Sequence, residues 1–174
     1  MDPIATVGQR APDFSLEDLG GAPHQMEEML GRIVIINFWS AECPWSKKID
    51  KKLTEFLSTT DGEISLLSIA SNVNEPRDML MSCAEERGLQ IVLQDEDHAV
   101  ADLYDAVTTP HFFLIDSDGI LKYKGAFDDA TFHHPDADKD YLKDAIQAVQ
   151  RSRLPDPMET PGYGCALIRF ADGD

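Results

Sequence analysis

The chain contains the segment RIVIINFWSAECPWS at positions 32–46, from which most of its architecture can be deduced. Its first half, Arg32 to Trp39, is an almost unbroken run of apolar and β-branched residues, which predicts a buried central strand. From Pro44 to Thr59 the apolar residues recur at helical spacing, which predicts an amphipathic helix. A single cysteine, Cys43, stands at the junction between the two. The segment therefore predicts an α/β fold that carries its chemistry where this strand meets this helix.

Cys43 falls at or beside the N-cap of the predicted helix. Pro44 suits the first helical position because its missing N–H would be unpaired there, and the free N–H groups of Trp45 and Ser46 then point toward the sulfur. Lowering a thiol pKa by about two units needs about 2.7 kcal/mol, of which a helix dipole supplies about 0.3–1, or about 2 in a partly buried site. The Ser46 hydroxyl and nearby lysines are predicted to supply the remainder. The alternative is an inert, buried cysteine.

The rest of the chain alternates between strand and helix patterns. Strands are expected at 13–16, 64–70, 91–93, 110–116 and 120–125, and helices at 75–87, 97–104 and 138–151. Ser117-Asp118-Gly119 is a hairpin turn signal between the last two strands. This order predicts an α/β sheet with an antiparallel hairpin near its C-terminal end.

Length and charge exclude several classes of function. The 174 residues include 15 Lys and Arg against 32 Asp and Glu, a formal net charge of −17. The length predicts one domain, and the charge disfavours nucleic acid and anionic membranes as partners. The longest aliphatic run, Ile33 to Ile36, is too short to span a bilayer. The residues after Met1 show no secretory signal, which predicts a cytoplasmic protein with thiols that are reduced at rest.

The three cysteines, Cys43, Cys83 and Cys165, form neither a CxxC pair nor a secreted disulfide framework. Cys83 lies on the apolar face of a predicted helix and is interpreted as a core residue. Two interpretations of Cys165 stay open. About twelve residues from Arg153 onward span up to roughly 40 Å, so a disulfide with Cys43 is within reach. The favoured alternative is an edge strand in which Cys165 is incidental, formed by Ala166, Leu167, Ile168 and Phe170.

The segment Asn37–Ser46 resembles the active site of thioredoxin-fold proteins. The closest likeness is to the redoxin group, which spans the alkyl hydroperoxide reductase/thiol-specific antioxidant proteins and the thiol–disulfide oxidoreductases of cytochrome maturation. Gly8–Phe14 is similar to the N-terminal segment of that group, and Val107–Pro110 to its cis-proline loop. Phe112–Lys124 matches its closing hairpin, and Gly164-Cys165 resembles the tail of one cytoplasmic-type branch.

This resemblance implies a thioredoxin-like three-layer sandwich with a central mixed sheet, an N-terminal extension and a C-terminal tail. The domain is expected to comprise residues 1–153, with residues 154–174 packed on or near it. It further implies a cis bond before Pro110, which exposes the Thr109 backbone beside the cysteine, where a substrate chain can pair as an added strand. Pro44, Trp45, Thr109 and Pro110 are therefore the candidate substrate-binding residues.

The sequence departs from the family pattern at three positions. The family's dithiol motif Cys-x-x-Cys becomes Cys43-Pro44-Trp45-Ser46, and a serine cannot form a disulfide. The peroxiredoxin signature is half present, because Ser40 fits it and Ile36 does not. Asn37 replaces the buried acid of thioredoxins, which removes the usual internal proton acceptor.

The function expected from these features is a thiol-dependent oxidoreductase that uses Cys43 as a single-cysteine nucleophile on disulfides or peroxides. The candidate catalytic residues are Cys43, Ser46 and Cys165, and resolution would come from an external thiol or from Cys165. The expected partners are a thiol or disulfide protein, or a peroxide, with glutathione or a thioredoxin-type reductant. The lysines that follow Cys43 either favour anionic thiols such as glutathione or form a solvated face.

No metal or other cofactor is expected. Two adjacent histidines, His133 and His134, are interpreted as loop residues rather than metal ligands. The sequence carries no nucleotide-binding glycine motif. The alternative function is a redox-inactive thioredoxin-fold module that binds partners or acts like a chaperone, because the second cysteine of the motif is lost.

Overall fold

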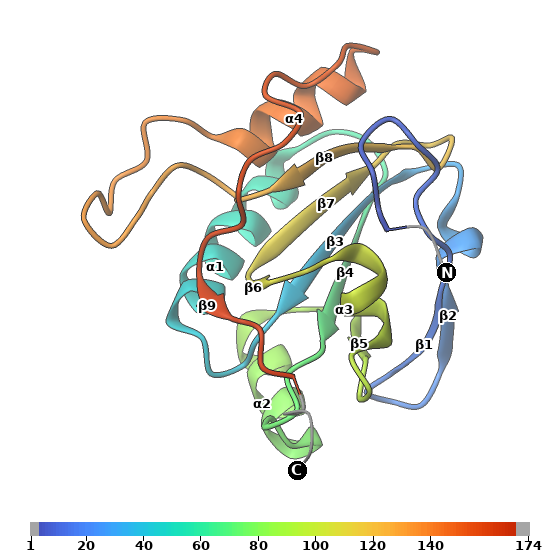
Figure 1. Ribbon diagram of the computed structural model, residues 1–174, viewed down its shortest axis with the longest axis vertical. Helices are drawn as coiled ribbons and strands as arrows, with labels where there is room; N and C mark the ends of the chain where they lie inside the picture. The colour runs from blue at the N-terminus through green and yellow to red at the C-terminus, as the bar shows by residue number, and fades with distance from the viewer. Residues whose placement is uncertain (1–3, 170–174) are drawn as a thin grey trace.

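A computed structural model describes residues 4–169 of the chain, with a mixed β-sheet at its centre (Figure 1). The strands of the sheet are β1 (Ser15–Asp18), β2 (Pro23–Gln25), β3 (Ile33–Trp39), β4 (Ile64–Ala70), β5 (Val92–Gln94), β7 (His111–Ile115) and β8 (Leu121–Gly125). They lie in the order β2-β1-β5-β4-β3-β7-β8. Strands β3, β4 and β5 are parallel, and the outer strands join them antiparallel on both sides.

Helices cover both faces of the sheet. On one face, α1 (Pro44–Thr59), α2 (Arg77–Arg87) and α4 (Tyr141–Gln150) supply the apolar side chains of two core clusters. On the other face, α3 (Ala99–Tyr104) packs with the N-terminal segment in a third cluster. These layers confirm the predicted three-layer sandwich and its mixed sheet.

Strand β3 lies inside both cores, which explains its nearly continuous apolar sequence. Val34, Ile36 and Phe38 join the cluster on the α3 side, whereas Ile35 and Trp39 join the clusters under the other helices. All five side chains are inaccessible to solvent. A strand that is buried on both faces does not alternate with polar residues, and this one ends at Trp39, four residues before Cys43.

The bounds of α1 and β4 are those predicted from the sequence, and most other elements shift by one to three residues. The predicted strand at 13–16 forms later, as β1 at Ser15–Asp18. The structure also contains short elements that no sequence pattern predicted, among them β2 and a 3-10 helix at Met26–Met29. No helix among residues 4–169 combines the length and the apolar character that crossing a bilayer would require.

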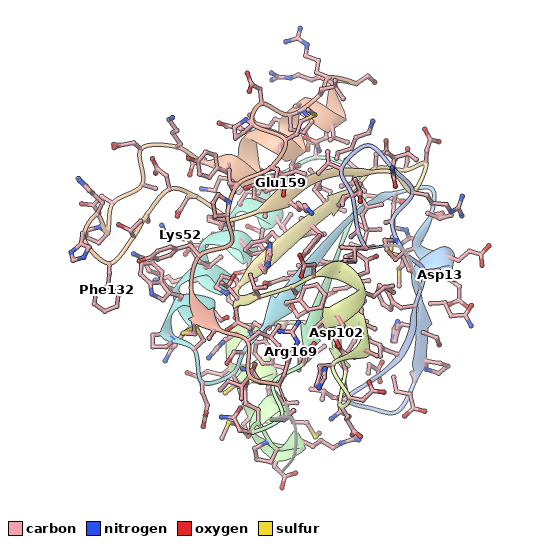
Figure 2. The ribbon with its side chains drawn as sticks, in the orientation of Figure 1. Asp13, Lys52, Asp102, Phe132, Glu159 and Arg169 are labelled. Carbon is pink, nitrogen blue, oxygen red and sulfur yellow. A yellow bond between two sulfur atoms is a disulfide. The ribbon has the colours of Figure 1, made fainter. Side chains whose placement is uncertain are left out.

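The C-terminal tail runs back across the domain and is held along its length. Thr160 bonds to β8 through its N–H, which donates to the Lys124 carbonyl at 3.0 Å. Further on, β9 (Cys165–Ala166) pairs antiparallel with β6 (Thr108–Thr109), and Leu167 is buried in the core beside α3. Arg169 then binds Asp102 at 2.8 Å, and Figure 2 shows the two side chains together. The predicted edge strand is thus shorter than expected, and Phe170 lies outside the described residues.

Candidate active site

Cys43 forms a disulfide with Cys165, 122 residues further along the chain. It occupies the N-cap of α1, with Pro44 in the first turn, and its side chain is only 3% exposed. The Cα atoms of the two cysteines are 6.1 Å apart, within the usual range for a disulfide. The Cys43 sulfur also lies 3.1 Å from the carbonyl oxygen of Thr109. The site therefore joins the end of β3, the start of α1, the loop before β7 and the tail.

The partner of Cys43 arrives as an added strand. In the register of β6 and β9, Thr109 is opposite Cys165 and Thr108 is opposite Ala166. The Thr109–Pro110 peptide bond is cis. The tail thus occupies the place where the sequence predicted an external chain to pair. Cys165 does lie in a short strand, but the favoured interpretation that the residue is incidental was wrong, because its sulfur is linked to Cys43.

Glu75 binds the loop that precedes Cys43. Its Oε1 accepts hydrogen bonds from the N–H groups of Ala41 and Glu42, the latter at 3.1 Å. Its Oε2 accepts from the Ser40 hydroxyl at 2.9 Å, and Ser40 Oγ accepts in turn from the Cys43 N–H at 3.1 Å. Glu75 is almost fully buried. A buried carboxylate with this many donors fixes the backbone that presents the cysteine.

The carbonyl groups of the same loop bind the guanidinium group of Arg87. Arg87 donates to the Ser40 and Ala41 oxygens at 3.3 and 2.5 Å, and to Asp50 Oδ2 at 3.1 Å. Asp50 also accepts from Trp39 Nε1 at 2.6 Å. Burial raises the pKa of Asp50 to about 6, against the opposing effect of these two donors. The loop is therefore held between a buried acid on its N–H side and a buried arginine on its carbonyl side.

Asp50 is a second buried acid that the sequence reading did not find. Asn37 stands in β3 as predicted, but neither its Oδ1 nor its Nδ2 has a hydrogen-bond partner among residues 4–169. Asp50 lies on α1 instead, and its side chain is 2% exposed. Its place in the apolar stripe of an amphipathic helix is the signal that identifies it. Glu75 and Arg87 carry no such signal, because their roles depend on contacts between distant segments.

Ser46 does not make the contact predicted for it. The side chain is fully buried, and its Oγ accepts from the Ser40 N–H at 3.4 Å. Within the described part of the chain, no hydrogen bond joins Ser46 to Cys43. The Ser46 side chain points back toward the loop, so its hydroxyl supports the loop rather than the sulfur.

Trp45 lies on the outer side of the site and meets two other aromatic rings. The Tyr163 ring packs edge-on against it with centroids 5.2 Å apart, and the Phe132 ring is 6.3 Å away. Lys48 lies over the same indole at 5.2 Å and donates to the Pro135 carbonyl. Trp45 therefore connects α1 to the tail and to the loop that follows β8.

His111 lies beneath the tail. It is buried, its Nδ1 accepts from the Val107 N–H at 3.3 Å, and its ring stacks at a tilt on Phe113. Burial lowers the pKa of His111 to about 4, and the nearby charge of Lys124 acts in the same direction. The imidazole is therefore neutral at neutral pH and serves here as an acceptor and a packing surface.

Other features of the sequence lie outside this arrangement. The lysines after Cys43 line an open cleft on α1 of about 720 Å³, together with Glu55 and Glu86. Lys52 is paired with Asp128 at 3.1 Å. His133 and His134 are exposed, and in the portion of the chain that the structure describes no group of three or more metal-ligating side chains gathers.

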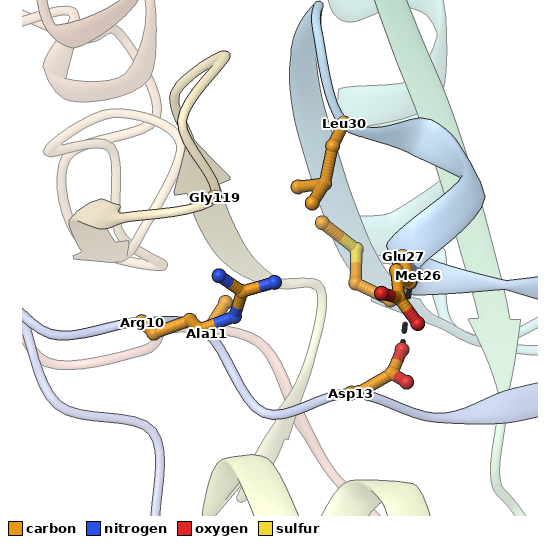
Figure 3. Close-up of a pocket in the computed structure, with 7 residues that line it drawn as sticks. All are labelled: Arg10, Ala11, Asp13, Met26, Glu27, Leu30 and Gly119. Carbon is orange, nitrogen blue, oxygen red and sulfur yellow. Dashed lines mark hydrogen bonds between the residues drawn. The ribbon is translucent and has the colours of Figure 1, made fainter.

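A small cavity of about 190 Å³ lies between the N-terminal segment and the hairpin turn (Figure 3). Arg10 and Asp13 line it, and Asp13 accepts from the Glu27 N–H at 3.1 Å. In the view of Figure 2, Asp13 is on the opposite side of the molecule from β9. The cavity is therefore separate from the disulfide.

Two solved structures resemble nearly the whole chain. A hypothetical protein from Sinorhizobium meliloti is 29% identical, with a TM-score of 0.85 and 98% of both chains covered. An uncharacterized conserved protein from Geobacillus kaustophilus is 25% identical, with a TM-score of 0.84, covering 99% of this chain and 96% of that one. The similarity thus extends beyond the core sheet and includes most of the tail.

The sequence comparisons identify the family. The thiol–disulfide oxidoreductase ResA of Geobacillus kaustophilus is 31% identical over 118 residues, which is 67% of each protein. The model of the AhpC/TSA family matches residues 7–124, from the N-terminal segment to the closing hairpin. This match covers more than half of the sequence. The chain therefore belongs to the AhpC/TSA family of thioredoxin-fold proteins and is related to its thiol–disulfide oxidoreductases.

Proposed function

We propose that the protein reduces disulfides with Cys43 as the nucleophile and Cys165 as the resolving thiol. The observation that carries this proposal is the disulfide between these two residues, in which β9 presents Cys165 to Cys43 by pairing with β6. Ser46 replaces the second cysteine of the motif, and Cys165 supplies the missing sulfur from the tail. Of the two resolving thiols expected from the sequence, the internal one is favoured.

The reaction has two exchange steps. The Cys43 thiolate attacks one sulfur of a substrate disulfide, which forms a mixed disulfide and releases the other substrate sulfur as a thiolate. The Cys165 thiolate then attacks the Cys43 sulfur, closes the internal disulfide and releases the first substrate sulfur. Two electrons pass from the cysteine pair to the substrate. An external dithiol or two monothiols must then reduce the internal disulfide.

The N-terminus of α1 supports the nucleophile and the leaving group. Cys43 is the N-cap, and the first N–H groups of a helix favour negative charge in their vicinity. The thiolate of Cys43 is thereby stabilised both before attack and after reduction of the internal disulfide. Glu75 and Arg87 bind the loop that precedes Cys43 from two sides, which keeps the sulfur in this position.

Trapping the intermediates tests this proposal. All variants carry Cys83→Ser, which removes the one further cysteine. With a chromogenic aromatic disulfide, the reduced parent should release two thiols per chain and lose two hydrogens by mass, with no adduct. Cys165→Ser should release one thiol and keep one adduct on Cys43.

Three results would contradict the proposal. Cys43→Ser should react much more slowly, through Cys165 alone, and an unchanged rate would exclude Cys43 as the nucleophile. Two adducts on the parent would exclude Cys165 as the resolving thiol. Replacing the disulfide by a peroxide tests the second substrate class. A chain inert toward both reagents would instead be a redox-inactive binding module.

A further inference from the structure

Two glycines of the tail lie against the loop before β7, with no room for a side chain at either position. A Cβ atom at Gly162 would lie 2.6 Å from Thr108 Oγ1 and 3.2 Å from the His111 ring. A Cβ atom at Gly164 would overlap the carbonyl oxygen of Thr109. The backbone of a strand at this place approaches the loop so closely that only glycine is accommodated at these two positions.

The residue between the two glycines is held by aromatic contacts. Tyr163 packs edge-on against Trp45 with an interplanar angle of 86°, and its hydroxyl oxygen accepts from the Phe132 N–H at 2.9 Å. Edge-to-face rings at such distances attract each other through their quadrupoles. The Trp45 ring and the Phe132 backbone N–H therefore form a subsite for the residue two positions before the tail cysteine, and the Phe132 ring lies 6.3 Å from that of Trp45.

Tyr163 also lines a small pocket beside this subsite. With the tyrosine in place, the remaining cavity is only about 10 Å³, barely enough for one water molecule. Besides Tyr163, the pocket is lined by an apolar surface that includes Trp45, Ile49, Pro110, Phe127 and Ala130, and by Asp128. Departure of the tail would expose this apolar surface to water, so the pocket favours another ring in the same place.

Phe132 extends this surface toward the solvent. It is 79% exposed although its ring centroid is 6.3 Å from that of Trp45, and Figure 2 shows its ring at the edge of the molecule, pointing away from the sheet. It belongs to the loop that connects β8 to α4, whereas Trp45 belongs to α1. An exposed phenylalanine beside an aromatic subsite provides apolar contact area beyond what the tail requires. A longer bound chain can cover this area.

We propose that the disulfide substrate is a protein segment that replaces the tail, and this inference rests on the proposed function. The segment is extended, pairs with β6, and carries an aromatic residue two positions before its cysteine with glycine on both sides of that residue. The tail sequence Gly162-Tyr163-Gly164-Cys165 is the internal copy of this pattern. The aromatic side chain enters the subsite formed by Trp45 and Phe132.

The chemistry of exchange follows from this placement. The substrate cysteine takes the position of Cys165, so the Cys43 thiolate attacks its sulfur and the other substrate cysteine leaves as a thiolate. Because tail and substrate compete for β6 and for the same subsite, return of the tail displaces the bound segment. Attack by the Cys165 thiolate on the Cys43 sulfur then releases the substrate as a dithiol.

Peptides that copy the tail test the inference. The probes are acetylated PGYGCAL amides whose cysteine carries thionitrobenzoate as a mixed disulfide, with Ala replacing either Tyr or the Gly before Cys. The protein is the full reduced chain with Cys83→Ser and Cys165→Ser, and release of the coloured thiol gives the rate. The Ala-for-Tyr peptide should react about three- to tenfold more slowly, the range expected for one aromatic pair. The Ala-for-Gly peptide should also be slower.

A variant of the protein localises the effect. Trp45→Ala removes the ring on which Tyr163 packs, so it should narrow the ratio between the rates of the Tyr and the Ala peptides. Phe132→Ala keeps the backbone N–H that binds the tyrosine hydroxyl and should leave most of that ratio in place. The mixed disulfide of mercaptoethanol and thionitrobenzoate serves as the probe without a peptide. If this small disulfide reacts and all peptides react alike, the inference is overturned while the proposed function stands. If neither the small disulfide nor any peptide reacts, the proposed function itself fails.

Discussion

The backbone of Thr109 in β6 pairs with the backbone of Cys165 in β9. The residue that forms the disulfide with Cys43 therefore also belongs to a strand that pairs with β6. The disulfide and the strand pairing hold the same segment, and each contributes to the stability of the other. The tail is therefore a structural part of the domain in the oxidised protein, besides its proposed part in the chemistry.

Reduction of this disulfide is expected to lower the free energy of unfolding. The bond closes a loop of 122 residues, and a native disulfide typically contributes about 2–4 kcal/mol by restricting the unfolded chain. Urea denaturation with and without a reductant measures the difference. Cys83→Ser is the matched control, because Cys83 is a free cysteine and its replacement should leave the difference unchanged. An equal stability of Cys165→Ser and the oxidised parent would contradict this expectation.

Glu75→Gln is expected to destabilise the protein by about 1–3 kcal/mol, the cost of an unsatisfied buried polar group. Glu75 accepts from backbone N–H groups with one oxygen and from Ser40 and Asn72 with the other. A glutamine has a single oxygen, so its NH₂ group must face one set of donors. Urea denaturation measures the loss. Glu86→Gln, at a site with a 67% exposed side chain, should cost little, and a similar loss in both variants would contradict the argument.

The same substitution should loosen the tail. Asn72 donates to Glu75 at 2.7 Å, and its Oδ1 accepts from the Ile168 N–H at 2.7 Å. Asn72 thus connects the loop before Cys43 with the tail beyond Cys165. Faster amide exchange at Ile168 in Glu75→Gln than in Glu86→Gln is the expected result. Unchanged exchange would show that the tail is held independently of Glu75.

Sequence patterns predicted the parts of the fold that depend on local periodicity. The bounds of α1 and β4 follow from long runs of regular spacing, and the junction at Cys43 follows from a buried strand that ends before a proline. Strands β6 and β9 have two residues each, which is too short for any period to appear. Their pairing is decided by tertiary contacts, so the sequence left the partner of Cys43 open.

The support of the site was not predictable for a related reason. Ser46 is three residues after Cys43, and its position suggested a bond to the sulfur, yet the hydroxyl accepts from Ser40. The contacts that fix the loop come from Glu75 and Arg87, which are more than thirty residues away in the chain. Non-local hydrogen bonds of this kind leave no spacing signature in a single sequence.

His111 should make the protein less stable as the pH falls from about 6.5 to about 4. Burial lowers its pKa to about 4 in the folded state, whereas an unfolded histidine titrates near 6.5. Between these values the unfolded chain binds a proton that the folded chain does not, so the free energy of unfolding decreases with falling pH. His111→Asn should remove this contribution, as followed by urea denaturation across the range. The exposed His134→Asn should behave like the parent, and a parent-like slope in His111→Asn would refute the assignment.

Asp50 should make the protein less stable as the pH rises over part of the same range, which is opposite to the effect of His111. Burial raises its pKa to about 6 in the folded state, and an unfolded aspartate titrates near 3.9. Between these values the folded chain retains a proton that the unfolded chain has lost, so the free energy of unfolding decreases as the pH rises. The full effect is at most about 3 kcal/mol, from two pKa units at about 1.4 kcal/mol each.

Asp50→Asn therefore tests the pH profile as a whole. Between about pH 4 and pH 6 the contributions of Asp50 and His111 offset each other in the parent. Removing the carboxyl should leave the histidine effect alone, so the variant should gain stability more steeply with rising pH than the parent does. The exposed Asp61→Asn is the matched control and should keep the parent's profile. A profile of Asp50→Asn that runs parallel to that of the parent from pH 4 to pH 6 would show that Asp50 is already ionised throughout this range, paired with Arg87 at 3.1 Å.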